Sequence, residues 1–516
     1  MLRTLRHLGR SLRIARALAR HDALFLAEVH PVGRFAARTL GIIFPARRDV
    51  AKLRPGQRLA LALAGLGPTF IKFGQALSTR ADLLGEAVAA DLADLQDRLP
   101  PFPFAEAKAT IEADFGKPLS ALFKTFDPAP VAAASIAQVH FAVDSDGRDV
   151  AVKVLRPHIE QTFAGEIDFL DWLAGLTERF APQLARLKPR EVVDTFAETV
   201  RIEMDLRFEA AAAQELAENF ADVPTFKVPT VDWQRTGQHV LTLERVGGMR
   251  VDNRSAIVAA GLDPVAVVRS AAEIFFRMVF RHGFFHADMH PGNLFVAPGA
   301  GPEGVVIAVD FGIMGRIDAA TQRTLGEMLL GFLTRDYKKV AEVHMAAGFV
   351  PGHKSADAFA QAARSIAEPI MGKPIAEISV AKLLGQLFAI TETFEMQVQP
   401  QLLLLQKSML VTEGVGRGLA PEVNMWDLAR PLVEGWMRER LGPEGRIGEA
   451  VGDAAATLAK IPRIIDRIDR TTSEIEREGL KLHPSTRAAL AGNGRGWRGW
   501  LPWAVAAAVV VAWIVA

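Results

Sequence analysis

Hydrophobic and polar residues alternate in only a few short stretches of this chain, and elsewhere they recur at helical spacing. The clearest alternation is VHFAV, a DSDG turn and DVAVKVL over residues 139–155, which predicts an antiparallel hairpin. VLTLERV at 240–246, NLFV at 293–296 and VVIAVDFG at 305–312 predict three further strands. We therefore expect an α+β fold with a small antiparallel sheet.

Helical periodicity covers the rest of the chain. It runs from residue 55 to 99, where prolines 100, 101 and 103 stop it, and then from 159 to 220. A further helix is expected from about 263 to 282, and everything beyond about 320 has a helical pattern.

Length, charge and cysteine content exclude several classes of protein. The 516 residues exceed what one core usually supports, so about three folding units are expected. A formal net charge of +1 gives no electrostatic footprint for nucleic acid, and we expect none as a partner. The absence of cysteine excludes disulfides, thiolate metal sites and cysteine nucleophiles.

The N-terminal 20 residues form a basic amphipathic pattern, with arginine at three- and four-residue steps from Arg3 to Arg20. Two interpretations stay open. The helix either packs on its own protein or lies on an anionic membrane surface.

The C-terminal residues 500–516, WLPWAVAAAVVVAWIVA, carry no charged side chain. As a helix they would reach about 25 Å, slightly less than the hydrocarbon core of about 30 Å. We expect a membrane helix over 498–516 that anchors the chain at the cytoplasmic face of the cell inner membrane. A buried terminal core helix is the alternative.

The segment FFHADMHPGNLF, residues 284–295, contains the spacing His-x-Asp-x-x-x-x-Asn of a phosphoryl-transfer loop. In this pattern Asp288 meets the attacking hydroxyl and Asn293 holds Mg²⁺. Upstream, Lys153 in VAVK is placed to pair with the phosphates of ATP, and downstream Asp310 in DFG is placed to hold Mg²⁺. The order of the three motifs predicts a protein-kinase-like bilobal fold, with a small antiparallel-sheet N-lobe and a helical C-lobe.

The loop before the lysine should be glycine-rich, but alanine stands at each glycine position of the pattern. Alanine penalises positive φ, so this nucleotide-covering loop should be stiffer than usual. The candidate nucleotide-binding residues here are Ala132, Ala133, Ala134, Ser135, Ile136, Ala137, Gln138 and Val139.

Three carboxylates on the helical segment IEMDLRFE are candidates to hold Lys153, namely Glu203, Asp205 and Glu209. Glu244 ends the VLTLE strand, where the linker between lobes would meet adenine. After His286 the chain has Ala287 rather than Arg, so regulation through an activation-loop phosphate is not expected. His286 and His290 leave a transition-metal site as a minor alternative.

The segment GPTFIKFGQALSTRADLL, followed by LQDRLPP, resembles the UbiB family of atypical protein-kinase-like ATPases. The K-x-G-Q motif of that family matches Lys72, Gly74 and Gln75, its E-x-D motif matches Glu203 and Asp205, and its alanine-rich loop matches Ala132 to Ser135. The resemblance implies that Lys72 and Gln75 face the nucleotide and block peptide substrates. It also implies a Lys153–Glu209 ion pair, Asp288 as catalytic residue, and Asn293 and Asp310 as Mg²⁺ ligands.

The resemblance further implies a role in ubiquinone biosynthesis, with ATP and Mg²⁺ as cofactors. Membrane lipids, prenylated ubiquinone precursors and a ubiquinone-biosynthesis complex are the expected partners. A homodimer stays an open interpretation, because an Ala/Val-rich C-terminal helix can pair by close packing. We expect an ATPase or phosphotransferase of the kinase type. A small-molecule phosphotransferase and an ATP-gated lipid-binding module are the alternatives.

These patterns divide the chain into five expected regions. They are basic amphipathic helices (1–50), a helical extension with the K-x-G-Q motif (51–125), the kinase-like core (126–350), a helical C-terminal part (351–495) and the membrane helix (498–516).

Overall fold

The computed structural model describes residues 2–25, 31–78, 84–93, 95, 99–180, 188–371, 390, 393–396 and 400–441. The chain divides into two compact units, Met1–Trp436 and Met437–Ala516, and the site described below lies in the first.

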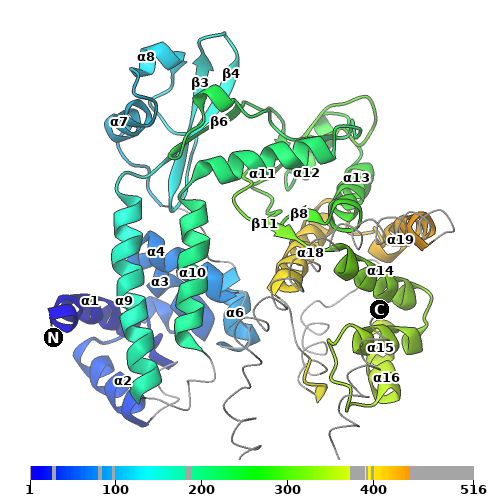
Figure 1. Ribbon diagram of the computed structural model, residues 1–516, viewed down its shortest axis with the longest axis horizontal. Coiled ribbons are helices and arrows are strands. Elements are labelled where there is room, and N and C mark those ends of the chain that lie inside the picture. The colour runs from blue at the N-terminus through cyan, green and yellow to red at the C-terminus, as the bar shows by residue number, and fades with distance from the viewer. Residues whose placement is uncertain are drawn as a thin grey trace, which may run out of the picture. The chain divides into compact units, whose positions relative to one another are not determined.

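In the described residues the strands form three small sheets, and nearly all of their pairings are antiparallel (Figure 1). The largest sheet has the order β1-β3-β4-β6 with β2 on β3, the second has the order β5-β10-β9-β7, and β8 pairs with β11. The strands are β1 (Phe123–Phe126), β2 (Ala132–Ala133), β3 (Ala137–Asp144), β4 (Asp149–Leu155), β5 (Phe226–Lys227), β6 (Val240–Glu244), β7 (Met249–Arg250), β8 (Phe284–His286), β9 (Leu294–Ala297), β10 (Val305–Ala308) and β11 (Met314–Arg316).

Helices make up most of the rest of the described chain. They are α1 (Leu2–Arg20), α2 (Pro31–Ile43), α3 (Pro55–Leu66), α4 (Pro68–Ser78), α6 (Glu86–Ala93), α7 (Phe104–Phe115), α8 (Leu119–Leu122), α9 (Ile159–Phe180), α10 (Pro189–Glu203), α11 (Leu206–Asn219), α12 (Arg254–Ala259), α13 (Pro264–Phe276), the π-helical turn η5 (Arg277–His282), α14 (Ala319–Leu333), α15 (Tyr337–Ala346), α16 (Ala356–Ala367), α18 (Pro400–Leu419) and α19 (Met425–Leu441).

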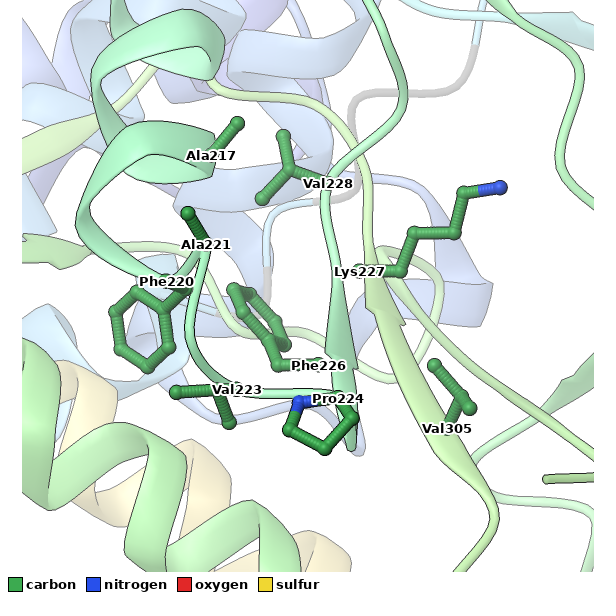
Figure 2. Close-up of a pocket in the computed structure, with 9 residues that line it drawn as sticks. All are labelled: Ala217, Phe220, Ala221, Val223, Pro224, Phe226, Lys227, Val228 and Val305. Carbon is green, nitrogen blue, oxygen red and sulfur yellow. The ribbon is translucent and has the colours of Figure 1, made fainter. Parts of the chain in front are cut away.

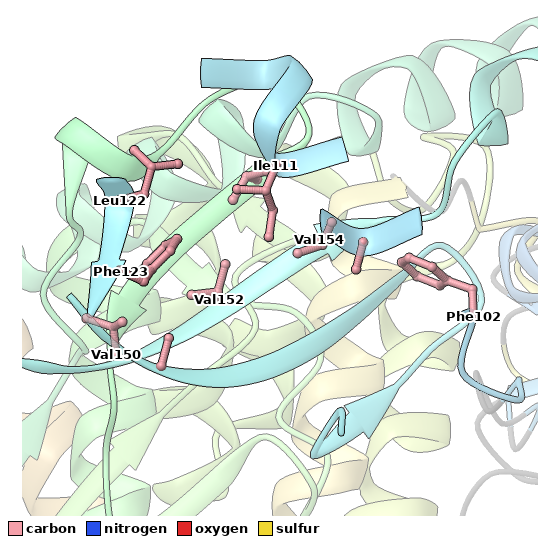
Figure 3. Close-up of a cluster of buried hydrophobic side chains, with 10 residues drawn as sticks. Phe102, Ile111, Leu122, Phe123, Val150, Val152 and Val154 are labelled. Carbon is pink, nitrogen blue, oxygen red and sulfur yellow. The ribbon is translucent and has the colours of Figure 1, made fainter. Parts of the chain in front are cut away.

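The expected hairpin is confirmed as β3 and β4, in a register that places Val139 opposite Lys153. Val150, Val152 and Val154 are buried on one face of β4, where they join a core with Ile111 of α7 (Figure 3). Because side chains alternate along a strand, Lys153 projects from the opposite face. The apolar pattern that builds this core therefore also positions the lysine.

In the described residues, the helical stretch expected from 159 to 220 contains α9, α10 and α11. The break that matters lies at Met204, where α10 ends and α11 begins. Asp205 is the N-cap of α11, because its carboxylate accepts a hydrogen bond from the backbone N–H of Arg207. Glu203 and Glu209 thus lie on two different helices, although IEMDLRFE was expected to be one helical segment.

The N-terminal helix α1 packs on the protein itself, as one of the two interpretations held. Arg13 forms an ion pair with Glu166 at 2.7 Å, and Arg10 donates to the backbone oxygen of Gly165. His7 is fully buried, with its ring 5.3 Å from that of Trp172. These contacts join α1 to α9 (Figure 1).

The expected localisation needs correction. In the part of the chain that the structure describes, no helix is long and apolar enough to cross a membrane. The 20-residue helix α18, for example, carries Lys407, Glu413 and Arg417. The membrane helix expected at 498–516 lies outside the described residues, so anchoring at the inner membrane through it is not supported.

Candidate nucleotide and phosphoryl-transfer site

Two carboxylates meet at Lys153, that of Glu209 on α11 and that of Asp310 in the DFG motif. Its Nζ lies 2.8 and 2.9 Å from the two carboxylate oxygens of Glu209 and 3.0 Å from Oδ1 of Asp310. Lys153 and Glu209 are largely buried, whereas the Asp310 side chain is half exposed. The Lys153 ammonium thereby joins strand β4, helix α11 and the segment after β10.

Charge interactions keep Lys153 and Asp310 of this cluster ionised. Burial alone lowers the pKa of Lys153, but the carboxylates of Asp310 and Glu209 outweigh it and raise that pKa well above its usual range. The Lys153 ammonium holds the pKa of Asp310 well below its usual range, and Lys72 adds to this effect. Burial raises the pKa of Glu209. Lys153 and Asp310 are therefore both charged at neutral pH.

Asp310 adopts a left-handed backbone conformation, with φ of 64°. A non-glycine residue pays for this conformation in free energy, typically about 1 kcal/mol or more, and such outliers concentrate at functional sites. The neighbouring Phe311 is 1% exposed, and its ring meets that of His286 edge-on at 5.7 Å. Burial of Phe311 fixes the backbone that presents the Asp310 carboxylate.

The catalytic loop is held by its own polar groups. Buried His286 accepts a hydrogen bond at Nδ1 from the backbone N–H of Asp288, and its Nε2 lies 3.2 Å from the carbonyl oxygen of Val309. Burial lowers the pKa of His286, so the ring is neutral and orients the loop. The Asn293 amide nitrogen donates to the backbone oxygen of Asp288 at 3.0 Å and to its Oδ2 at 3.3 Å.

The donor set suits Mg²⁺. Because the amide nitrogen of Asn293 binds Asp288, its amide oxygen is the atom left for a cation, and with the Asp310 carboxylate it provides the hard oxygen ligands that Mg²⁺ takes. Within the described ranges no group of three or more His, Asp or Glu side chains is placed to hold a metal ion. His290 instead accepts a hydrogen bond from the backbone N–H of Gly292.

The K-x-G-Q helix α4 is joined to the E-x-D turn by an ion pair. Lys72 Nζ lies 2.9 Å from the Glu203 carboxylate, and both side chains are about nine-tenths buried. Asp205 does not share this pair, because it caps α11 and binds the Arg207 guanidinium. One carboxylate of the motif therefore holds α4, and the other begins the helix that carries Glu209.

The remaining K-x-G-Q residues pack and bond locally. A Cβ at Gly74 would meet the Leu63 side chain at 2.8 Å and the Leu95 side chain at 3.0 Å, so glycine lets α4 approach α3 without a shift of these side chains. Gln75 donates from Nε2 to the backbone oxygen of Leu95 at 3.3 Å. The charge of Lys72 contributes to the lowered pKa of Asp310, whereas the side chain of Gln75 binds Leu95 rather than the cluster.

The alanine-rich loop begins at β2, and Ala134 to Ile136 connect it to β3. The Ala134 carbonyl accepts hydrogen bonds from the Arg156 guanidinium, which ties the loop to the end of β4. Gln138 was a candidate nucleotide ligand, but its side chain is fully buried and binds the backbone of Phe102 and the ring of His140. Ser135 and Ala137 are likewise buried, while Ala132 is exposed.

Glu244 lies at the end of β6, where its carboxylate pairs with Lys227 and accepts from the Thr230 hydroxyl. Its backbone N–H donates to the backbone oxygen of Thr230. The end of the strand is therefore held through both the backbone and the side chain of Glu244. Lys227 is also at the edge of a pocket of about 430 Å³ whose other lining residues are apolar (Figure 2). The pocket lining contains no carboxylate, so it is distinct from the Lys153 cluster.

Sequence reasoning missed one charged residue at the site. Lys407 of α18 places Nζ 3.0 Å from Oδ1 of Asp288, across 119 residues of chain. The sequence feature that could have indicated this residue is a single lysine within the mostly apolar run Leu402–Val411.

These features define an atypical kinase-like protein, and comparisons with known proteins agree. Residues 94–344 match the ABC1 atypical kinase-like domain, and residues 363–424 match the UbiB helical domain. A Marinobacter nauticus protein named "Probable protein kinase UbiB" is 42% identical over 85% of this chain and 80% of its own length. A relative of the same name from Pseudomonas paraeruginosa is 43% identical over 84% of this chain and 82% of its own length. The chain belongs to the UbiB family.

The fold is also similar to that of a solved structure. Rv3197 from Mycobacterium tuberculosis, determined in complex with erythromycin, aligns with a TM-score of 0.52 at 24% identity. The alignment covers 70% of this chain and 91% of that protein. At this identity the likeness establishes the fold alone.

Proposed function

We propose that this protein is a kinase-fold ATPase of ubiquinone biosynthesis, which binds ATP and Mg²⁺ and acts on or with prenylated quinone precursors. The observation that carries the proposal is Lys153, bound to both Glu209 and Asp310 at 2.8–3.0 Å. Lys153 would hold the phosphates, and Asn293 and Asp310 would hold the Mg²⁺ that bridges them. Asp288 would orient the attacking hydroxyl or water.

The helix α4 supports a substrate other than protein. The positive charge of Lys72 on α4 contributes to the lowered pKa of Asp310, the carboxylate that would handle phosphate. The buried pair with Glu203 holds α4 in place. We expect α4 to hinder a peptide that approaches Asp310 from its side.

A small-molecule phosphotransferase is the second candidate. Asp288 favours catalysis of either kind over an ATP-gated lipid-binding module, because a pure binder has little need of a carboxylate held by both Asn293 and Lys407.

The test is phosphate release from ATP and Mg²⁺ by the full chain, with and without a prenylphenol, beside an Asp288→Asn control. Release that the prenylphenol stimulates and the control loses supports the ATPase. ATP consumption matched by phosphate on the phenol, detected by mass spectrometry, supports the phosphotransferase. Equal turnover in the control would contradict both.

A further inference from the structure

The helix α18 docks on the catalytic loop through residues of one face. Lys407 forms an ion pair with Asp288, the Ser408 hydroxyl lies 3.4 Å from the backbone oxygen of His286, and the Thr412 hydroxyl lies 3.9 Å from the Met289 sulfur. Ser408 is fully buried. The backbone of Lys407 is therefore held in place by the docked helix. Its side chain is 29% exposed and reaches the Asp288 carboxylate of the catalytic loop.

The other two lysines of the site have carboxylate partners away from Asp288. Lys153 is bound by Glu209 and Asp310, and Lys72 by Glu203. In the described chain, the cation paired with the Asp288 carboxylate is Lys407. Phosphoryl transfer places the terminal phosphate next to this carboxylate, and two anions brought together there need a nearby positive charge.

We infer that Lys407 is a catalytic residue that binds the terminal phosphate of the nucleotide; this inference rests on the proposed function. The oxygen of water or of an acceptor hydroxyl forms a bond to the γ-phosphorus, and the bond from that phosphorus to the β,γ-bridging oxygen breaks. The electron pair of the broken bond leaves with ADP, and the proton of the attacking group passes to Asp288. The Lys407 ammonium keeps its proton and moves from Asp288 to the phosphate oxygens, which its flexible four-carbon stem permits.

The inference separates ATP from ADP, because only ATP presents the phosphate that Lys407 would bind. With the full chain, Lys407→Met should lower kcat for phosphate release by about 10²-fold, in the range found when one stabilising donor is removed from a transition state. Its affinity for a non-hydrolysable ATP analogue with Mg²⁺ should fall about tenfold, with ADP affinity unchanged. Lys407→Arg should restore part of both losses.

A matched control is Lys339→Met, which removes a surface lysine that pairs with Glu327 at 3.2 Å, and it should behave as wild type. Thermal unfolding of each variant checks that it is folded. Turnover in Lys407→Met at or above the wild-type rate, or equal losses of ATP-analogue and ADP affinity, would overturn this inference and leave the proposed function standing. A wild-type chain that binds neither nucleotide would overturn both.

Discussion

Lys72 and Glu203 form a largely buried ion pair at 2.9 Å, which joins the K-x-G-Q helix α4 to the last residue of α10. Asp205, two residues after Glu203, is the N-cap of α11. This short turn therefore connects the K-x-G-Q helix α4 to the helix that carries Glu209.

The coupling between Lys72 and Glu203 can be measured with a double-mutant cycle. Lys72→Met and Glu203→Gln should each lower the free energy of unfolding by about 2–4 kcal/mol, because each leaves one buried charge without this partner. The double variant should be less destabilised than the sum of the single variants, with a coupling energy of at least about 1 kcal/mol. Urea unfolding of the four proteins gives the result, and strict additivity would contradict it.

Lys153 should serve both stability and nucleotide binding, and two variants separate these roles. Lys153→Met leaves Glu209 buried without its cation, which should cost about 3–5 kcal/mol of stability and abolish measurable ATP binding. In Lys153→Met/Glu209→Leu the buried charge is also gone, so stability should partly return while ATP binding does not. Recovery of ATP binding in the double variant would show that Lys153 does not hold the phosphates.

Gly315 should tolerate no side chain. A Cβ at this position in β11 would overlap the ring of Phe285 in the paired strand β8. The Phe285 side chain is fully buried, so it has little room to move. Gly315→Ala should therefore lower the free energy of unfolding by about 1–3 kcal/mol through overpacking. Gly414→Ala is the control, because an added Cβ there meets nothing within 4 Å and helix propensity favours alanine by up to about 1 kcal/mol. Equal stability of the two variants would be inconsistent with this packing.

His239 should make stability depend on pH. Burial alone lowers its pKa, but the hydrogen bond and charge of Asp114, with Glu160 adding to them, outweigh burial and raise it. A raised folded pKa stabilises the fold fully below the unfolded value of about 6.5, and this contribution is lost as the pH rises through the folded pKa. Urea unfolding at about pH 5.5 and 8.5 should show a larger loss for wild type than for His239→Gln, and equal losses would refute the assignment.

Local patterns were sufficient to predict the hairpin and the motif residues. Alternation along β4 fixes which face carries Lys153, and the short spacing within the catalytic loop fixes Asp288 and Asn293 on one turn of chain. The break between α10 and α11 was missed because Met204 continues the apolar pattern, and the capping bond of Asp205 is visible only in the folded backbone. The partner of the Gln138 side chain could not be predicted for a similar reason, since Phe102 lies 36 residues away.

The sequence by itself determined the kinase-like class and the candidate residues for ATP and Mg²⁺, because these depend on residue type and on spacings of a few positions. Only the tertiary structure decided which side chains meet. The packing of α4 pairs Lys72 with Glu203 rather than Asp205, and the docking of α18 brings Lys407 to Asp288. Such contacts depend on how separate helices bury their apolar faces against one another, and no short-range pattern encodes that arrangement.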